Sequence, residues 1–300
     1  MNWLTLSLLT ALAVSTQDAW VKKFFSHLSA YHMVAYPALY SLPLFTAGLC
    51  FIERPPLDGV YLWCLLISLP LNGVSFVLYM RAIKISPLSL TLPYLAFTPV
   101  FMIITGALIL DEMPNLWGII GIITTCLGGY VLNLDPARLS FWAPFKAVFK
   151  ETGSWLMLIV AFIFSFAAVV GKQGILHSSV FFFTFSFFAA FNFLFLLLLL
   201  VLRVIRLETY ARVSVKGLVA GILFFLQAVF HGSAISLTKA AYMISLKRLS
   251  ILFGVLYGAV VFKEQNIGVR LIGATLMLLS LIHISEPTRP PVASRMPSSA

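Results

Sequence analysis

TPVFMIITGALILDE at residues 98–112 recurs as SILFGVLYGAVVFKE at residues 250–264, and both apolar runs end in glutamate. Further pairs share this offset of 152 residues: Ala82 and Ala234, Ile83 and Ile235, Gly121 and Gly273, and Leu127 and Leu279. Each run is long enough to form a helix within a membrane. The sequence therefore predicts a duplicated, membrane-spanning unit.

A second offset, of 150 residues, relates Lys22 and His27 to Lys172 and His177. Identities among apolar residues arise easily by chance, whereas paired glutamates, glycines and Lys-x4-His spacings do so less often. Many secondary transporters consist of two such units, with a substrate site where the halves meet.

Composition excludes an ordinary water-soluble domain. Apolar residues make up 61% of the chain and charged residues 10%, with a mean hydropathy of +1.01. The net charge of +10 would suggest nucleic acid in a soluble protein, but the basic residues fall largely at the ends of apolar runs. We expect membrane lipid rather than nucleic acid as the surrounding partner. The three cysteines are scattered within apolar segments, so no disulfide framework, metal site or cofactor is expected.

The chain is predicted to be an all-α integral membrane protein with ten transmembrane helices. The expected spans are residues 3–25, 29–52, 60–83, 88–110, 115–134, 155–175, 180–202, 216–237, 240–262 and 267–284. Residues 1–134 and 155–284 then form two five-helix repeats joined by the connection 135–154. An odd number of spans per repeat places the halves in opposite orientations, which makes the repeat inverted. The excess of Lys and Arg in the odd-numbered connections places both termini outside the cytoplasm.

The tail at residues 285–300 is rich in Pro, Ser and Arg and has no hydrophobic period. It is predicted to be disordered or a non-native extension, and it carries no functional argument.

The run from Ser245 through Lys247, Arg248 and Gly258 to Glu264 resembles the ninth helix of EamA-type transporters, in the drug/metabolite transporter superfamily. The stretch 99–121 is similar to that family's fourth and fifth helices, and the resemblance extends to about residue 284. It implies a multi-pass protein of the bacterial inner membrane that moves small solutes, often amino acids or metabolites. A homodimer is a further expectation. The polar stretch Ser15-Thr16-Gln17-Asp18 departs from a generic member.

Lys247 and Arg248 are the leading candidates for binding a substrate. They lie seven and eight residues into the ninth span, about 11–12 Å along it at ~1.5 Å per residue. A charge at such depth costs roughly 2.5–3.5 kcal/mol on insertion scales, so these side chains are expected to face protein or water. They either bind an anionic group or form a switching ion pair, unless the helix begins later and they anchor at the interface.

Asp18, Lys22 and Lys172 are candidates for coupling or ion pairing. Asp18 precedes Lys22 by four residues, so the two could pair on one helix face. Alternatively, Asp18 is a proton-coupling carboxylate or the counter-ion of a cation on the ninth span. The offset of 150 residues relates Lys22 to Lys172 and predicts that they lie at opposite faces of the membrane.

Polar residues on the third and eighth spans form a second candidate set. Asn72, Ser75 and Tyr79 share a helix face, and the offset maps Ser75 to Gln227 and Tyr79 to His231. We expect these residues to line a cavity, with His231 as a second proton-relay candidate. The alternative is that they are hydrogen bonds between helices, worth ~0.6 kcal/mol each on average.

Four further features receive structural interpretations. The spacings Gly217-x3-Gly221 and Gly254-x3-Gly258 indicate close helix packing. The phenylalanine-rich region 181–195 is predicted to face lipid. Glu112 and Glu264 are interpreted as boundary residues in preference to ion-binding groups. Pro93 and Pro99 are predicted to remove backbone hydrogen bonds within the fourth span only and to make it the more deformable gate.

Three classes of function remain open. The favoured one is a secondary active transporter of a small organic metabolite, of amino-acid or organic-anion type, working by alternating access. No phosphate-binding loop is present, so an ion or solute gradient would supply the energy. A polytopic enzyme acting on lipid needs clustered catalytic residues, which the sequence lacks, so no catalytic residue is assigned. A passive channel fits the repeat but lacks filter-like rings.

Overall fold

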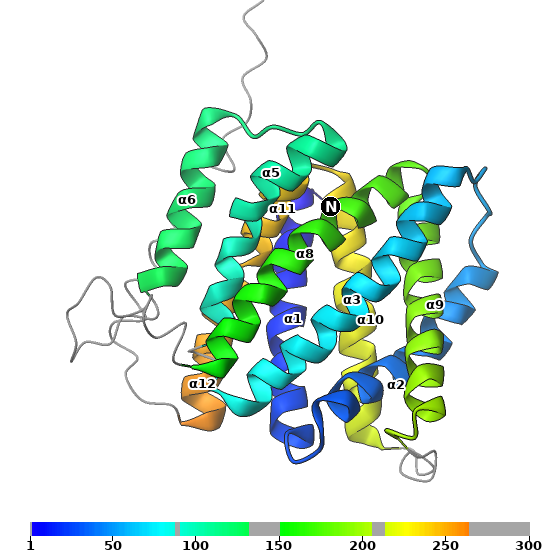
Figure 1. Ribbon diagram of the computed structural model, residues 1–300, viewed down its shortest axis with the longest axis vertical. Coiled ribbons are helices and arrows are strands. Elements are labelled where there is room, and N and C mark those ends of the chain that lie inside the picture. The colour runs from blue at the N-terminus through cyan, green and yellow to red at the C-terminus, as the bar shows by residue number, and fades with distance from the viewer. Residues whose placement is uncertain (1, 88–90, 132–150, 206–213, 264–300) are drawn as a thin grey trace, which may run out of the picture.

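The computed structural model describes residues 2–87, 91–131, 151–205 and 214–263, where every regular element is a helix (Figure 1). The elements are α1 (Trp3–Phe25), α2 (Ala30–Cys50), α3 (Gly59–Ile85), the 3-10 helix η1 (Leu92–Phe97), α5 (Thr98–Leu110), α6 (Leu116–Val131), α8 (Thr152–Leu176), α9 (Val180–Val201), α10 (Val215–Ser236), α11 (Ala240–Lys247) and α12 (Ser250–Phe262). The all-α prediction is confirmed for these residues.

Capping side chains explain where five of the helices begin. Asn2, Ser29, Asp58, Ser179 and Ser214 each accept a hydrogen bond from the backbone N–H three residues further on. These bonds satisfy N–H groups that the first turn of a helix leaves without an acceptor. The five helices start within one residue of the predicted spans.

Six helices are long and apolar enough to cross a membrane: Ala30–Cys50, Gly59–Ile85, Thr152–Leu176, Val180–Val201, Val215–Ser236 and Ala240–Phe262. The shorter segments Tyr94–Leu110 and Leu116–Gly128 are also apolar helices. The predicted span 267–284, most of the connection 135–154 and the tail lie outside the described residues. Because α8 begins at Thr152, the last three residues of the predicted connection, 152–154, belong to this helix.

The fourth and ninth predicted spans are both interrupted near their middle. η1 gives way to α5 at Thr98, and α11 ends at Lys247 before α12 begins at Ser250. Around Arg248 the bonds tighten to the i→i−3 type, from Leu249 N to Leu246 O (3.1 Å) and from Ile251 N to Arg248 O (2.9 Å). The prediction that bending of the fourth span has no counterpart in the ninth is therefore wrong.

The two prolines do not break these helices in the predicted way. Pro93 lies in the first turn of η1 and Pro99 in the first turn of α5. An N–H in the first turn has no acceptor within its own helix, so neither proline removes an intrahelical bond. The two prolines therefore give no reason to expect the fourth span to deform more easily than the ninth.

Corresponding helices recur at the offsets found in the sequence. α5 and α12 each have 13 residues, and their bounds differ by 152. Each ends at a non-glycine residue with a left-handed backbone, Asp111 (φ 54°) and Lys263 (φ 53°). The backbone N–H at these caps donates to Gly106 O and Gly258 O respectively. The two segments thus share one helix-ending geometry.

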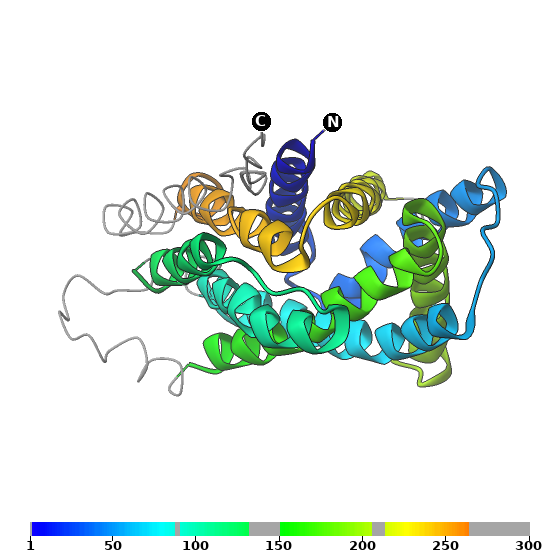
Figure 2. The same cartoon turned by 90° about the horizontal axis from the view of Figure 1, so that it is seen from above.

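Helices from the first half of the chain pack chiefly on helices from the second half. α3 and α5 contact α8, α1 contacts α10 and α12, and α2 contacts α9 and α10. Seen from above, α1, α10, α11 and α12 lie along one side and α3, α5 and α8 along the other, with α2 and α9 at one end (Figure 2). Residues far apart in the sequence therefore meet in the space between these layers.

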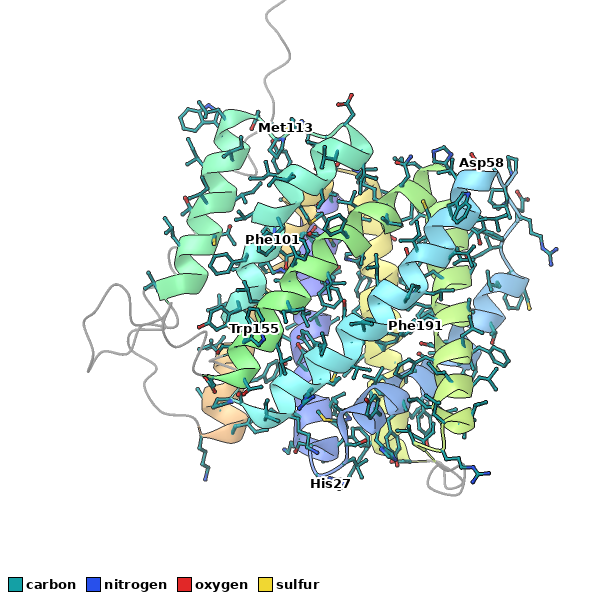
Figure 3. All side chains as sticks on the ribbon, viewed as in Figure 1. His27, Asp58, Phe101, Met113, Trp155 and Phe191 are labelled. Atoms are coloured by element: carbon teal, nitrogen blue, oxygen red, sulfur yellow. The ribbon has the colours of Figure 1, made fainter. Side chains whose placement is uncertain are left out.

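Most phenylalanines of α9 are buried, which contradicts the prediction that this region faces lipid. Phe183, Phe187 and Phe191 are at most 5% exposed, although Phe181 and Phe193 on the same helix are exposed. The buried rings follow one helix face, where Phe187 and Phe191 stack with their centroids 5.9 Å apart. Figure 3 labels Phe191 within the helix assembly. Apolar residues that face protein or lipid look alike in sequence, which explains the error.

Gly221 brings α10 close to the backbone of α2, in agreement with the predicted packing role. A Cβ added to Gly221 would lie 2.5 Å from Tyr40 Cβ and 2.7 Å from the Tyr40 carbonyl carbon. Real Cβ contacts are longer, so α2 itself would have to move.

We expect Gly221→Ala to lower the free energy of unfolding by about 1–3 kcal/mol, as overpacking typically does. Thermal unfolding of purified protein in detergent would measure the change. Gly59→Ala is the matched control, because a Cβ there meets nothing within 4 Å. Equal unfolding midpoints for the two variants would show that the close approach of α2 and α10 at Gly221 does not determine stability.

An ion pair joins the start of α3 to the end of α8. Asp58 Oδ1 accepts from Tyr61 N at 2.9 Å, and its Oδ2 lies 2.6 Å from His177 Nδ1. The backbone N–H of Tyr61, followed by the hydrogen bond to His177, lowers the pKa of the Asp58 carboxyl below its usual value. Asp58 lies at the same edge of the molecule as Met113, opposite His27 (Figure 3).

This lowered pKa predicts a stability change in acid. A carboxyl whose pKa is depressed by folding stabilises the fold above its unfolded pKa of ~3.9, and the contribution is lost as pH falls through the folded pKa. We therefore expect the advantage in unfolding temperature of the wild type over Asp58→Asn to shrink between about pH 5 and pH 3. Asparagine keeps the cap but does not titrate. A constant difference across this range would contradict the assignment.

Candidate functional site

A cavity of about 160 Å³ lies between the two halves of the chain. Its walls come from α1, α3, α8, α9, α10 and α11. An apolar cavity of ~150 Å³ holds benzene, so this space suits a small organic molecule. The polar and charged lining residues are Gln17, Asp18, Ser68, Asn72, Tyr79, Lys172, Thr184, Gln227, His231, Lys247 and Arg248.

Lys247 and Arg248 reach the cavity from the break between α11 and α12. Arg248 is 4% exposed, and its Nη2 donates to Thr98 Oγ1 at 2.7 Å. The Arg248 Nε is buried without a hydrogen-bond partner among the described residues. Lys247 Nζ lies 3.4 Å from His231 Nδ1. Neither cation forms an ion pair within the described part of the chain, so both have bonding capacity for a ligand.

Asp18 lines the same cavity and accepts a hydrogen bond from the Tyr79 hydroxyl of α3. It makes no ion pair with Lys22, Lys247 or Arg248. The expected Asp18–Lys22 pair is therefore not formed, whereas Asp18 shares the cavity with Lys247 and Arg248 and remains their candidate counter-ion without direct contact. Lys22 points elsewhere, since its Nζ donates to Ser86 O at 2.9 Å.

Lys172 joins the two halves at one end of the cavity. Its Nζ donates to Glu112 Oε1 and to Thr238 O, the latter at 2.6 Å. The second Glu112 oxygen accepts from Ala240 N at 2.9 Å, at the start of α11. Glu112 follows the end of α5, as predicted for a boundary residue, but it also forms an ion pair between the halves.

The two lysines related by the offset of 150 residues, Lys22 and Lys172, make corresponding bonds to backbone carbonyls. Ser86 and Thr238, the carbonyl acceptors of Lys22 and Lys172, are themselves related by the offset of 152 residues. Ser86 lies after α3 and Thr238 after α10. Glu264, the counterpart of Glu112, lies outside the described residues.

The polar stripe on α3 has a different register from the predicted one. Ser75 is fully buried, donates to Leu71 O at 2.7 Å and does not line the cavity. The cavity face carries Ser68, Asn72 and Tyr79 instead. Asn72 donates to Ser68 O at 2.9 Å. A serine can bond within its own helix, so helical spacing alone did not identify which polar residues face the cavity.

On α10 the two residues predicted from the offset of 152, Gln227 and His231, line the cavity. Gln227 Nε2 donates to Gln17 Oε1 of α1 at 2.6 Å, and His231 lies beside Lys247. Gln17 was missed by the sequence analysis, although it adjoins Asp18. Of the ten candidates named from sequence, the structure brings all but Ser75 and Lys22 to the cavity.

Sequence reasoning also missed an aromatic wall, which consists of Phe76, Phe164, Phe183, Phe187 and Phe188. The ring centroids of Phe76 and Phe164 lie 5.9 Å apart, and those of Phe187 and Phe188 lie 4.9 Å apart. Both pairs meet edge to face, a favourable arrangement for aromatic rings. The wall gives the cavity an apolar side distinct from its cationic side.

These features first define a class: a helical, multi-pass membrane protein with a polar cavity between its two halves. The model of the EamA-like transporter family matches residues 1–134. This match over the first 134 residues confirms the resemblance to EamA-type transporters of the drug/metabolite transporter superfamily that the sequence showed.

One similar solved structure is a crystal structure described only as "Crystal structure of protein". It is 13% identical with a TM-score of 0.64, over 92% of this chain and 96% of that chain. At this identity the likeness shows a shared fold alone. A search of curated proteins found no match.

Proposed function

We propose that this protein is a secondary active transporter that carries a small organic solute with an anionic group across a membrane. The observation that carries the proposal is the cavity between the halves, where Lys247 and Arg248 make no direct ion pair among the described residues. Buried charges are costly and usually mark a substrate or ion pathway in membrane proteins.

The proposed architecture is a pair of inverted five-helix repeats, residues 1–134 and 155–284, in a bacterial inner membrane. Recurring helix bounds, the matching caps of α5 and α12 and the equivalent bonds of Lys22 and Lys172 support it. So does the interruption of both the fourth and the ninth span, because broken helices typically surround substrate sites in such transporters. Alternating access would rock the halves about the cavity.

Asp18 is the proposed coupling group. It is a buried carboxylate in the cavity, bonded to Tyr79, and its counterpart in the second half is Ala168. A proton or substrate cation reaching Asp18 would change the charge of the site. His231, beside Lys247, is a second proposed relay group.

Transport by purified protein in liposomes tests the proposal. Labelled amino acids and organic acids would be offered with and without an imposed pH gradient. Accumulation that depends on the gradient supports secondary transport. Chemical conversion of a solute or lipid would instead indicate an enzyme, and rapid equilibration that never exceeds the outside concentration would indicate a channel.

A further inference from the structure

The cavity has two chemically different sides. Lys247 and Arg248 belong to α11 and its end, which packs on α1, α5, α6, α8 and α10. The aromatic wall includes three residues of α9, a helix that packs on α2, α3, α8 and α10. Figure 1 shows α9 and α11 on different sides of α10. A ligand that fills the cavity therefore meets the two cations near α11 and aromatic rings near α9.

The charges of the cavity select the charge of its ligand. Lys172 is neutralised by Glu112. The remaining charged groups are Lys247, Arg248 and Asp18. With all three ionised, their formal charges sum to one positive charge. A monoanion neutralises that charge, a zwitterion leaves it in place, and a dianion reverses its sign. Because uncompensated charge is costly in a buried site, the monoanion is favoured.

The bonding geometry favours a carboxylate as the anionic group. Among the described residues the Arg248 guanidinium makes one hydrogen bond, from Nη2 to Thr98 Oγ1, although it carries five N–H donors. A carboxylate in the cavity can accept from a remaining guanidinium N–H with one oxygen and from the neighbouring ammonium of Lys247 with the other.

We infer that the substrate class is an organic monocarboxylate with a single aromatic ring or an apolar body of similar size, lacking a positively charged amine. Its carboxylate contacts Arg248 and Lys247, and its body packs on Phe76, Phe187 and Phe188. The cavity volume of about 160 Å³ fits a one-ring acid. This inference rests on the proposed transport site, although it concerns binding and can be tested without transport.

Calorimetric titration of the purified full-length chain with four one-ring probes tests the ligand class. Phenylacetate is the expected ligand. Phenylglycine adds an ammonium group, phenylacetamide removes the charge, and phenyl phosphate is a dianion. We expect phenylacetate to bind at least about 10-fold more tightly than each of the other three, since a charge-assisted hydrogen bond contributes roughly 10- to 100-fold. Equal or tighter binding of any of the three would overturn the inference.

Variants test the assigned contacts. Arg248→Gln should weaken phenylacetate binding about 10- to 100-fold, whereas Arg81→Gln, at an exposed site outside the cavity, should leave it unchanged. Phe187→Leu should weaken phenylacetate more than acetate, because acetate has no ring. If Arg248→Gln does not fold, Lys247→Gln replaces it, with an expected loss of about 10-fold. Unchanged affinity in the folded cation variant would overturn the inference.

Binding and transport results are separable. Phenylacetate binding without transport of any solute would retain the ligand class and overturn the proposed function. Gradient-driven transport of another solute, with no phenylacetate binding, would overturn the ligand class and retain the function.

Discussion

Uptake into proteoliposomes should fall to background when Lys247 and Arg248 are both replaced by glutamine. Each cation is expected to contribute roughly 1.5–3 kcal/mol through a charge-assisted hydrogen bond to the solute. Together they account for about a 100-fold to 10,000-fold loss of binding. The test solute is whichever one the wild-type protein accumulates, and initial uptake rates at several concentrations give the loss.

The stability of this double variant distinguishes a binding role from a structural one. Lys247 and Arg248 make no ion pair among the described residues, and their main fixed contact is the bond from Arg248 to Thr98. A buried charge without an ion-pair partner costs free energy, so replacing it by a neutral amide removes that cost. We therefore expect an unfolding midpoint equal to or above that of the wild type. Transport lost together with stability would indicate that the cations hold the fold.

Arg81→Gln/Lys216→Gln is the matched control. It removes the same charge from exposed residues outside the cavity and should retain wild-type uptake. Wild-type uptake by the cavity variant would remove the two cations from the proposed site.

Charged residues were the most predictable part of the site. The depth of Lys247 and Arg248 in an apolar run implied a protein or water environment, since lipid tolerates such charges poorly. The repeat offset led from the third span to Gln227 and His231, which line the cavity. The prediction for the two cations succeeds because the free-energy cost of a charge in lipid outweighs differences in local packing.

Features decided by tertiary contacts were not predictable. The break near Arg248 contains neither proline nor glycine, so no local signal marked it. Ser75 and Ser68 both fit a helical polar stripe, and only packing determined which one faces the cavity. The rings of α9 could have faced lipid as easily as protein, because hydrophobicity is the same in both environments.

The ion pair between Lys172 and Glu112 gives the second large expected effect, this time on stability. Among the residues that the structure describes, Lys172→Met leaves the Glu112 carboxylate with Ala240 N as its one partner, and Glu112→Gln leaves the Lys172 ammonium with Thr238 O as its one charge-independent acceptor. Breaking a fully buried pair costs about 3–5 kcal/mol. The Glu112 side chain is 21% exposed, so we expect about 2–4 kcal/mol for each single variant.

The double variant Lys172→Met/Glu112→Gln should recover most of this loss, because no charge is then left without its partner. Unfolding midpoints of the wild type, both single variants and the double variant form a double-mutant cycle that measures the coupling. His177→Gln is the control at the same edge of the molecule, and it breaks a more exposed pair with Asp58. It should change stability much less. Additive losses at Lys172 and Glu112 would show that the two charges do not stabilise each other.

The same pair should also control access to the cavity, because it ties α8 of the second half to the α5–α6 connection of the first. Glu112→Gln removes the charge but can still accept from Ala240 N, so it loosens this end while keeping the start of α11 capped. A cysteine at Ala168 in the cavity wall, in a chain whose own cysteines are replaced, should then react faster with a membrane-impermeant thiol reagent. If access required no separation of the halves here, the labelling rate would not change. A faster rate in Glu112→Gln, and an equally fast rate in the double variant, which also lacks the tie, would connect the pair to the movement that the proposed transport requires.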